Sequence, residues 1–451
     1  MAKSNGKKTK GDQAPQGITH LTVGGFKSIA REQTIEIRPL TVLAGANSSG
    51  KSSMIQPLLL LKQTLEATYD PGPLKLDGPN VRFTSFDQMT TCISKTQSRQ
   101  VLRFGLNTEG VGKLGLEISR ANKKQFALAK MTFDSWGGPF EITPNSWPDV
   151  FNEVYKVLES AFQQNYPQTT IKTEVERVRC FFDIIGVGNS PEWQEARIFD
   201  RKPILSRVFP HTHCIQEVIH LPGHRGNPER NYPVTAVGKR FAGKFEVYTA
   251  SIIASWKTDE HSEKLEQLSS DLRNLSLTWK VEALPIDDTQ VELRVGRLTQ
   301  PQVGGGKDLV NIADVGFGVS QTLPVVVALL VAEPGQLVFL EQPEIHLHPR
   351  AQIAMAQLLA NAANRGVKVV VETHSSLLLL GIQSLVAEHK LSPDTVALHW
   401  FHRNDDGETN ITTAELDDAG RFGDWPEDFD DVTLQAQANY LNAAEKHRVA
   451  R

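Results

Sequence analysis

The chain has 451 residues, of which 40% are hydrophobic, and a formal net charge of −4 at pH 7. This length allows a large core divided into two or three lobes, and the slightly acidic balance argues against a uniformly basic nucleic-acid binder. The longest apolar run, residues 323–332, is far shorter than the roughly 20 residues that cross a bilayer, so we expect no membrane contact. Three widely spaced cysteines indicate no disulfide framework, so we expect a cytoplasmic protein.

The N-terminal part of the chain reads as a tail followed by strands. Residues 1–17 are polar and rich in lysine, and we expect them to be disordered. Residues 18–38 alternate apolar and polar side chains, as a pair of strands does when one face is buried. Three more strand-like runs between residues 101 and 134, separated by turns rich in Gly and Asn, predict a small antiparallel sheet. We therefore predict an N-terminal lobe over residues 18–146.

Within this lobe, residues 39–44 read as a short strand that runs directly into a glycine-rich loop. The loop matches G-x-x-x-x-G-K-[ST], in which glycines let consecutive backbone N–H groups face bound phosphates. The helix that we predict over residues 52–65 adds its positive N-terminal end. No Asn-Lys-x-Asp guanine-binding motif occurs, so ATP with Mg²⁺ is the expected ligand, with Lys51 on the β/γ-phosphates and the Ser52 hydroxyl on the metal. The candidate nucleotide-binding residues are Gly45, Asn47, Ser48, Ser49, Gly50, Lys51, Ser52 and Ser53.

The middle of the chain, residues 147–275, has a different pattern. Helix-like runs at 150–164, 173–186, 244–254 and 262–275 are interrupted by a segment rich in Pro, Gly and Arg, and we predict a mostly helical insertion. Basic residues in this segment are candidates for a DNA-contacting patch, with an ordinary solvated surface as the alternative. They are Arg225, Arg230, Lys239, Arg240 and Lys244.

Residues 276–400 return to a regular pattern, which begins with strands and a flexible joint at Gly304–Gly306. Helix and buried strand then alternate, which implies a mostly parallel sheet covered on both faces. Because the phosphate loop and this part of the chain are far apart in sequence, two halves must fold together into one nucleotide site. Residues 401–451 remain as a C-terminal tail subdomain. The predicted elements are helices at 319–331, 351–363 and 375–386 and strands at 336–340 and 367–372.

The buried strand at 336–340 runs into an acidic segment, Glu341-Gln-Pro-Glu-Ile-His-Leu-His-Pro349. Many nucleotide hydrolases present a carboxylate to Mg²⁺ and water at such a strand end. Two further segments belong to the pattern, namely Asp314–Gln321 at a helix start and Thr373–Ser375 after the next strand. With the phosphate loop, these four segments occur in the order typical of one group of ATPases.

In this arrangement the chain resembles the ABC-type head ATPases, including structural-maintenance-of-chromosomes heads. It is most similar to the ATPase part of the overcoming-lysogenisation-defect nucleases and their relatives in bacterial antiphage defence. The closer match rests on Glu341–Pro349, on Asn47 in the phosphate loop and on Val315-Gly-Phe-Gly-Val-Ser-Gln321, and it covers about residues 18–90 and 305–385. The resemblance implies an α/β P-loop NTPase of ABC-head type, with a mixed sheet and an antiparallel β subdomain.

The resemblance also implies roles for individual residues. Two ATP molecules are sandwiched between two subunits, so the protein is expected to form a homodimer or a higher homo-oligomer. Gly318 and Ser320, at a helix N-terminus that suits an anion, face the γ-phosphate held by the second protomer. His374 senses the γ-phosphate, and Glu341 holds Mg²⁺ through water.

Gln342 stands where the family normally has the acid that polarises the attacking water. An amide orients water but cannot accept its proton, and loss of a general base typically costs about 10²–10⁴-fold in rate. Glu344 can take over if the chain turns at Pro343. Three interpretations stay open, namely Glu344 as the base, slow hydrolysis or a binding-only switch, and a base from elsewhere.

These observations predict an ATPase that uses ATP-dependent dimer closure as a switch, as the regulatory subunit of an antiphage system. The roughly 75 residues after Ser375 are too few for the nuclease domain of the resembling family, so we expect a separate effector, a nuclease or toxin. One alternative is a DNA-binding repair or chromosome-associated head, although the insertion lacks the heptads of a long coiled coil. The other alternative is an ATP-binding scaffold with little hydrolysis.

Overall fold

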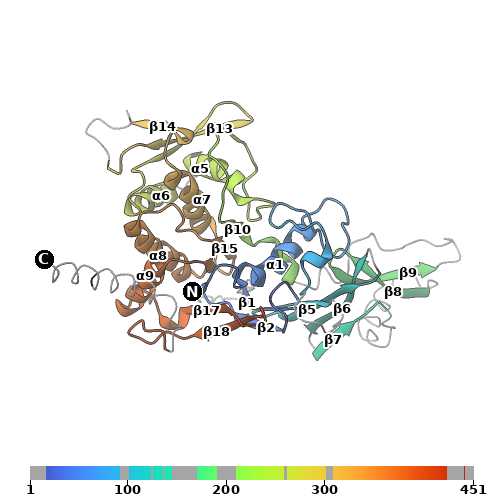
Figure 1. Ribbon diagram of the computed structural model, residues 1–451. Coiled ribbons are helices and arrows are strands. Elements are labelled where there is room, and N and C mark those ends of the chain that lie inside the picture. Colours follow the sequence, from blue (N-terminus) through green and yellow to red (C-terminus); the bar gives the residue numbers. More distant parts are fainter. Residues whose placement is uncertain are drawn as a thin grey trace, which may run out of the picture.

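The computed structural model describes residues 17–91, 101–122, 125–135, 138–144, 170–189, 210–258, 262–300, 308–423 and 441. It is a mixed α/β structure in which an open, mostly parallel sheet lies beside a large antiparallel one (Figure 1). Four predictions fall largely outside the described residues: the disordered N-terminal tail, the helix at 150–164, the glycine joint at 304–306 and the C-terminal tail beyond residue 423.

The central sheet has six strands in the order β10-β15-β16-β3-β17-β18, all parallel except for the antiparallel edge strand β18. The strand before the phosphate loop, β3, therefore lies between strands from the second half of the chain. This confirms that two distant halves of the sequence build one sheet. The strands are β3 (Leu40–Gly45), β10 (Ile219–Leu221), β15 (Leu337–Glu341), β16 (Lys368–Glu372), β17 (Val396–Arg403) and β18 (Thr409–Ala414).

Helices and the second sheet cover both faces of this sheet. Val338 and Leu340 of β15 point into a core formed with α5–α9, whereas Leu337 and Phe339 point into the core shared by α1 and the antiparallel sheet. Burial on both faces explains the continuous apolar runs of the strands. No helix in the described part of the chain is long and apolar enough to span a membrane. The helices are α1 (Lys51–Leu65), α5 (Thr249–Thr258), α6 (Ser262–Asn274), α7 (Phe317–Val331), α8 (Pro349–Asn364) and α9 (Ser376–Ala387).

The antiparallel sheet confirms the β subdomain expected from the sequence. Its strand order is β2-β1-β4-β5-β6-β7, and β11, β12, β13 and β14 form a smaller sheet near α5. The strands of the larger sheet are β1 (Ile18–Gly24), β2 (Gln33–Glu36), β4 (Val101–Thr108), β5 (Gly112–Arg120), β6 (Phe126–Ser135) and β7 (Gly138–Ile142). The smaller sheet comprises β11 (Tyr232–Pro233), β12 (Val281–Pro285), β13 (Gln290–Gly296) and β14 (Leu309–Asn311).

The predicted insertion differs from expectation in two places. The helix expected at 173–186 is wrong, because β8 (Thr170–Val178) and β9 (Phe181–Asn189) form an antiparallel hairpin there. Glu, Lys and Arg make this stretch look helical, yet its apolar residues alternate, and alternation with a tight turn favours a hairpin. In addition, β10 belongs to the central sheet and follows the short helix α4 (Pro210–Gln216). The helices expected at 244–254 and 262–275 are present, the first in part as a 3₁₀ turn followed by α5.

Candidate active site

The loop between β3 and α1 has the backbone that the phosphate-loop motif requires. Gly45, Ser48 and Gly50 have φ angles of 140°, 60° and 108°. A Cβ atom at Gly45 would lie 2.2 Å from the Phe401 carbonyl oxygen, and one at Gly50 would lie 2.4 Å from Thr409 Oγ1. Only glycine fits these two positions, so the strand and hairpin of β17 and β18 shape the loop from behind.

The Lys51 side chain is buried and folds back over the loop. Its Nζ donates hydrogen bonds to the carbonyl oxygens of Gly45 at 3.0 Å and Ala46 at 2.8 Å. Burial lowers the pKa of Lys51, and the charge of Glu372 opposes this shift. Hydrogen bonds from an ammonium to anionic oxygens are stronger than those to neutral carbonyl oxygens. We therefore expect the Lys51 ammonium to prefer phosphate oxygens to these two carbonyls.

The other loop residues divide into an exposed and a buried group. Asn47 and Ser48 are exposed, which leaves them free to contact a ligand. Ser49 is buried, and its hydroxyl has no hydrogen-bond partner among the described residues. Its carbonyl oxygen accepts a hydrogen bond from Thr409. Ser53, also buried, lies in the first turn of α1, whose N-terminal N–H groups face the loop.

Glu372 is a site residue that the sequence analysis missed. It ends β16, between the phosphate-loop strand and the acidic strand, and its Oε2 accepts a hydrogen bond of 2.8 Å from the Ser52 hydroxyl. Its side chain is buried, and burial raises its pKa. The available signal was an acid at the end of a buried strand, the same signal that drew attention to Glu341.

Glu341 ends β15, and its carboxylate is held from the β10 side of that strand, away from the phosphate loop. Its Oε1 lies 3.1 Å from His220 Nε2, and its Oε2 accepts a hydrogen bond of 3.1 Å from the Gly223 N–H. Burial alone would raise the pKa of Glu341, but the hydrogen bond and charge of His220 outweigh it and keep the pKa below its ordinary value. His220 lies in β10, stacks on the Phe339 ring and contacts Asn80 through Nδ1. The sequence analysis did not assign His220 to the site.

Gln342 and Glu344 follow in a tight turn. Gln342 has a φ of 45°, an unusual backbone conformation for this residue type that often marks functional turns. Glu344 is buried, and its Oε1 accepts hydrogen bonds from the Thr373 hydroxyl and from the His374 N–H. Burial raises the pKa of Glu344. Its Oε2 has no partner among the described residues, so one carboxylate oxygen is free to bind a proton or a water.

His374 follows β16 directly, near the start of the phosphate loop. Burial lowers its pKa, and the charge of Lys51 lowers it further. A neutral imidazole beside Lys51 donates or accepts a hydrogen bond without adding charge. The structure thus gathers the loop, Glu341, Glu344, Glu372 and His374 at the carboxyl ends of adjacent parallel strands, where α/β sheets commonly bind ligands.

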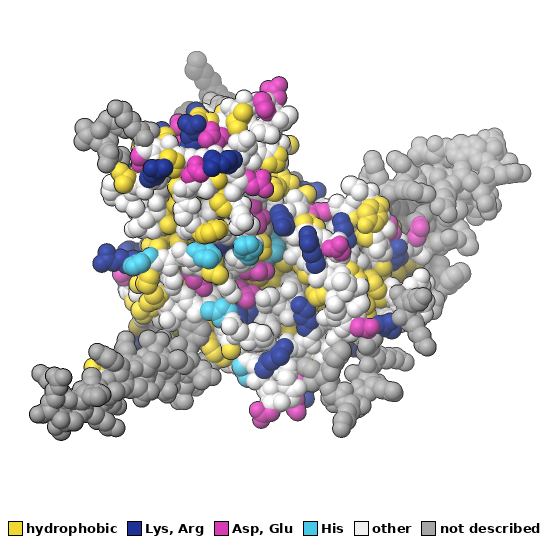
Figure 2. All heavy atoms as spheres, turned by 45° about the horizontal axis from the view of Figure 1, so that its top comes forward, with side chains coloured by type: hydrophobic (Ala, Val, Ile, Leu, Met, Phe, Trp, Pro, Cys, Tyr) yellow, Lys and Arg dark blue, Asp and Glu magenta, His cyan; other side chains and the backbone are white. Residues whose placement is uncertain are grey.

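The predicted signature segment lies at the start of α7, beside the end of the acidic segment. Gly316 caps α7, Gly318 lies in the first turn, and the Ser320 hydroxyl donates to the Phe317 carbonyl oxygen of the same helix. Phe317 is 52% exposed and contacts the ring of His346, and His346 and His348 are themselves exposed. Figure 2 shows histidine side chains in a row across the middle of one face of the molecule. At the start of α7, Gly316 and Phe317 are exposed, whereas Ser320 is buried.

Arg225 connects the signature helix with the acidic strand end. Its guanidinium donates to the carbonyl oxygens of Gln321 at 3.2 Å, Glu341 at 2.9 Å and Gln342 at 3.5 Å. It is 7% exposed, and burial lowers its pKa to about 10. Arg225 therefore does not belong to a DNA-contacting patch, and two other members of that prediction, Arg230 and Lys239, pair with acids at the surface.

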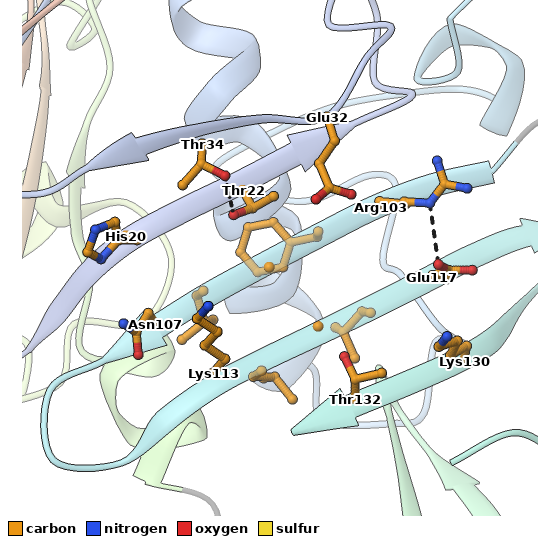
Figure 3. Close-up of a pocket in the computed structure, with 16 residues that line it drawn as sticks. His20, Thr22, Glu32, Thr34, Arg103, Asn107, Lys113, Glu117, Lys130 and Thr132 are labelled. Carbon is orange, nitrogen blue, oxygen red and sulfur yellow. Dashed lines mark hydrogen bonds and ion pairs between the residues drawn. The ribbon is translucent and has the colours of Figure 1, made fainter. Parts of the chain in front are cut away.

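A cavity of about 670 Å³ lies away from these residues, on the antiparallel sheet (Figure 3). Gly105 and Gly115 face each other across β4 and β5 in its floor. Polar side chains surround them, with Arg103 paired to Glu117 on one side and Lys113 on another. The lining shares no residue with the phosphate-loop site.

The oxygen atoms near the loop are of the type that binds Mg²⁺ together with a nucleotide. Mg²⁺ is usually held by one or two protein oxygens together with phosphate oxygens and water. Ser52 and the strand-end acids offer such oxygens. The described residues contain no cluster of three or more His, Cys, Asp or Glu side chains arranged to bind a metal on their own.

Comparisons with known proteins agree with this picture at a coarse level. Residues 266–380 match the family model described as "AAA domain, putative AbiEii toxin, Type IV TA system", a region from α6 into α9 that includes Glu341, Glu344 and His374. A comparison with curated proteins gives no match.

Among solved structures, the chain is similar to an SMC head bound to the C-winged helix domain of ScpA. The identity is 13% and the TM-score is 0.48, and the match covers 89% of this chain and 99% of the other. It is also similar to the SMC head domain from Thermotoga maritima, with 11% identity, a TM-score of 0.39 and coverage of 89% and 100%. An SMC head from Pyrococcus furiosus bound to the C-terminal domain of ScpA has 11% identity, a TM-score of 0.44 and coverage of 88% and 96%. Residues 266–380 are thus similar to an AAA domain, and they lie within a mixed α/β fold.

Proposed function

We propose that the protein binds ATP with Mg²⁺ and hydrolyses it to ADP and phosphate. One observation carries this proposal, namely that the phosphate-loop residues Lys51 and Ser52 lie beside Glu372, a buried acid at the end of the neighbouring strand β16. Phosphoryl transfer depends mainly on positioning and on charge stabilisation, and this arrangement supplies cationic, hydroxyl and carboxylate groups for both.

Each residue has a distinct part in this function. Lys51 would leave the Gly45 and Ala46 carbonyls and bind the β/γ-phosphates. Ser52 would hold Mg²⁺, which when bound neutralises charge on the phosphate oxygens. Glu344, whose pKa is raised and whose Oε2 is free of partners, would accept the proton of the attacking water. Gln342 would orient that water, and His374 would contact the γ-phosphate as a neutral ring.

A substitution at Lys51 tests this function directly. Lys51→Met should abolish ATP-dependent stabilisation of the protein, which for the wild type should reach about 2.7 kcal/mol at an ATP concentration 100 times Kd. Phosphate release should fall to background. Lys113→Met, which changes an exposed lysine on the antiparallel sheet, is the matched control and should behave as wild type. Equal ATP binding by wild type and Lys51→Met would overturn the proposal.

We infer further that ATP closes a homodimer. The start of α7 supports this step because Gly316 and Phe317 are exposed there, with Gly318 and Ser320 in the same turn of the helix. A second copy would place this anion-binding helix end against the γ-phosphate. Closure that waits for ATP and opening that follows hydrolysis would make the protein a switch.

Finally, we propose that this switch controls a separate effector in a cytoplasmic antiphage defence system. The matched family description names a putative AbiEii toxin and a type IV TA system, which supports a paired arrangement. The test is co-expression with the product of a neighbouring gene. The proposal predicts a nuclease or toxin that is active only with the wild-type ATPase. An adjacent gene product whose activity is the same with the wild type and with Lys51→Met would contradict it.

A further inference from the structure

The two strand-end acids differ in what they contact. Glu341 and Glu372 are direct neighbours in register across the parallel strands β15 and β16. Only Glu372 contacts the phosphate loop, by accepting a hydrogen bond from Ser52 at 2.8 Å. Both carboxylate oxygens of Glu341 are engaged on the far side, by His220 and by the Gly223 N–H.

We propose that Glu372, rather than Glu341, is the acidic positioning residue of the Mg²⁺ site, and that it acts through the Ser52 hydroxyl. The inference deepens the proposed ATPase function and rests on it. It assigns Glu341 a different task, which is to anchor the acidic strand to the edge strand β10 through His220.

The chemistry of a hydroxyl supports this assignment. Ser52 Oγ has one proton and two lone pairs, and Glu372 accepts the proton. A lone pair is then left to face the ligand side, where a hard cation such as Mg²⁺ needs an oxygen. Hydrogen bonds to metal ligands of this kind fix their orientation and raise their donor strength.

The burial of Glu372 also favours a cation nearby. Glu372 is 6% exposed, and the charge of Lys51 acts on its carboxylate and lowers its pKa against the effect of burial. A buried carboxylate is stabilised by a further cation, so a metal at the loop relieves part of the cost of its burial. Its burial and its contact with Ser52 therefore both place an acid beside the loop, at the end of β16.

Manganese binding separates the two acids. The experiment titrates Mn²⁺ into full-length protein saturated with ADP and reads bound Mn²⁺ by electron paramagnetic resonance. Glu372→Gln should weaken Mn²⁺ binding about 10- to 100-fold, the range typical of residues that orient metal ligands. The matched variant Glu341→Gln should weaken it less than about threefold on the same scale. ADP affinity measured in EDTA should be unchanged in both variants, which shows that the loop is intact.

A double variant tests whether Glu372 acts through Ser52. Ser52→Ala and Ser52→Ala/Glu372→Gln should lose Mn²⁺ affinity to the same extent, because removal of the hydroxyl already removes the effect of the acid. Glu372→Asp keeps the charge and should restore part of the affinity. Unchanged Mn²⁺ affinity in Glu372→Gln, a larger loss in Glu341→Gln, or additive effects with Ser52→Ala would each overturn the assignment. A wild-type protein that binds no ADP would overturn the ATPase function as well.

Discussion

Thr373 donates its hydroxyl proton to Glu344 Oε1 at 2.5 Å, so the two oxygens of this buried carboxylate differ, with Oε2 left free of protein partners in the described part of the chain. One oxygen is fixed and the other is available, as a general base requires. Glu344→Gln should therefore lower phosphate release about 10²–10⁴-fold and leave ATP affinity within a few-fold of wild type.

The companion variant Gln342→Glu distinguishes the remaining interpretations. If Glu344 is the base, an acid at position 342 changes the rate less than tenfold, a difference of about 1.4 kcal/mol in the barrier. A gain of several hundredfold would instead show that Gln342 keeps the enzyme slow. Single-turnover phosphate release measures both variants without interference from product release.

Much of the fold could be predicted from the sequence because its signals are local. The loop of Gly45–Ser52, the apolar runs at β15 and β16 and the helices α7–α9 follow from spacing and periodicity. The β8–β9 hairpin was missed because charged residues favour helix, whereas the pairing partner decides the structure. Glu372 ends a buried strand, which is a local signal, but its contact with Ser52 spans 320 residues of sequence. The contact between His220 and Glu341 spans 121 residues, and no local pattern encodes either contact.

Dimer closure can be tested with a substitution at the exposed start of α7. Gly316 has a φ of −64°, and a Cβ there would have no atom within 4 Å, so any side chain fits. Gly316→Asp places a negative charge at a helix N-terminus, which stabilises the monomer by roughly 0.3–1 kcal/mol. The same charge would repel the γ-phosphate presented by a second molecule.

Gly316→Asp should therefore bind ATP as wild type and have an equal or higher Tm, yet remain monomeric with ATP. Size-exclusion chromatography with light scattering measures this in the Glu344→Gln background, where slow hydrolysis preserves the dimer. Gly316→Ser is the neutral control and should dimerise. A dimer of the Asp variant that forms with unchanged ATP dependence would exclude this helix end from the interface.

The buried Arg225 should matter for both stability and rate. Arg225→Met removes the donor from three carbonyl oxygens, and each buried acceptor left without a partner costs about 1–3 kcal/mol. The turn at Gln342 loses its support, so kcat should fall more than ATP affinity. Arg230→Met breaks only an exposed pair with Asp314 and should change stability by less than about 0.5 kcal/mol. Thermal unfolding and ATPase kinetics compare the two, and equal effects would argue against a positioning role for Arg225.

His211 gives a prediction about pH that is independent of the nucleotide site. Its ring is 1% exposed and contacts the Thr108 hydroxyl through Nδ1, and burial lowers its pKa from 6.5 to about 4. The unfolded chain binds this proton more readily than the folded protein, so the stability present above pH 6.5 is lost as the pH falls toward 4. The loss should reach roughly 2 kcal/mol at pH 5.

His211→Asn removes the titrating ring and keeps a polar partner for Thr108. The variant should be less stable than wild type at pH 7.5. This difference should shrink by roughly 2 kcal/mol at pH 5, because protonation of His211 favours the unfolded chain in the wild type only. His213→Asn, which changes a half-exposed histidine on the same helix, is the control for the substitution itself outside the buried core. Urea unfolding at both pH values gives the free energies, and parallel stability losses in wild type and His211→Asn would show that another group causes the acid sensitivity.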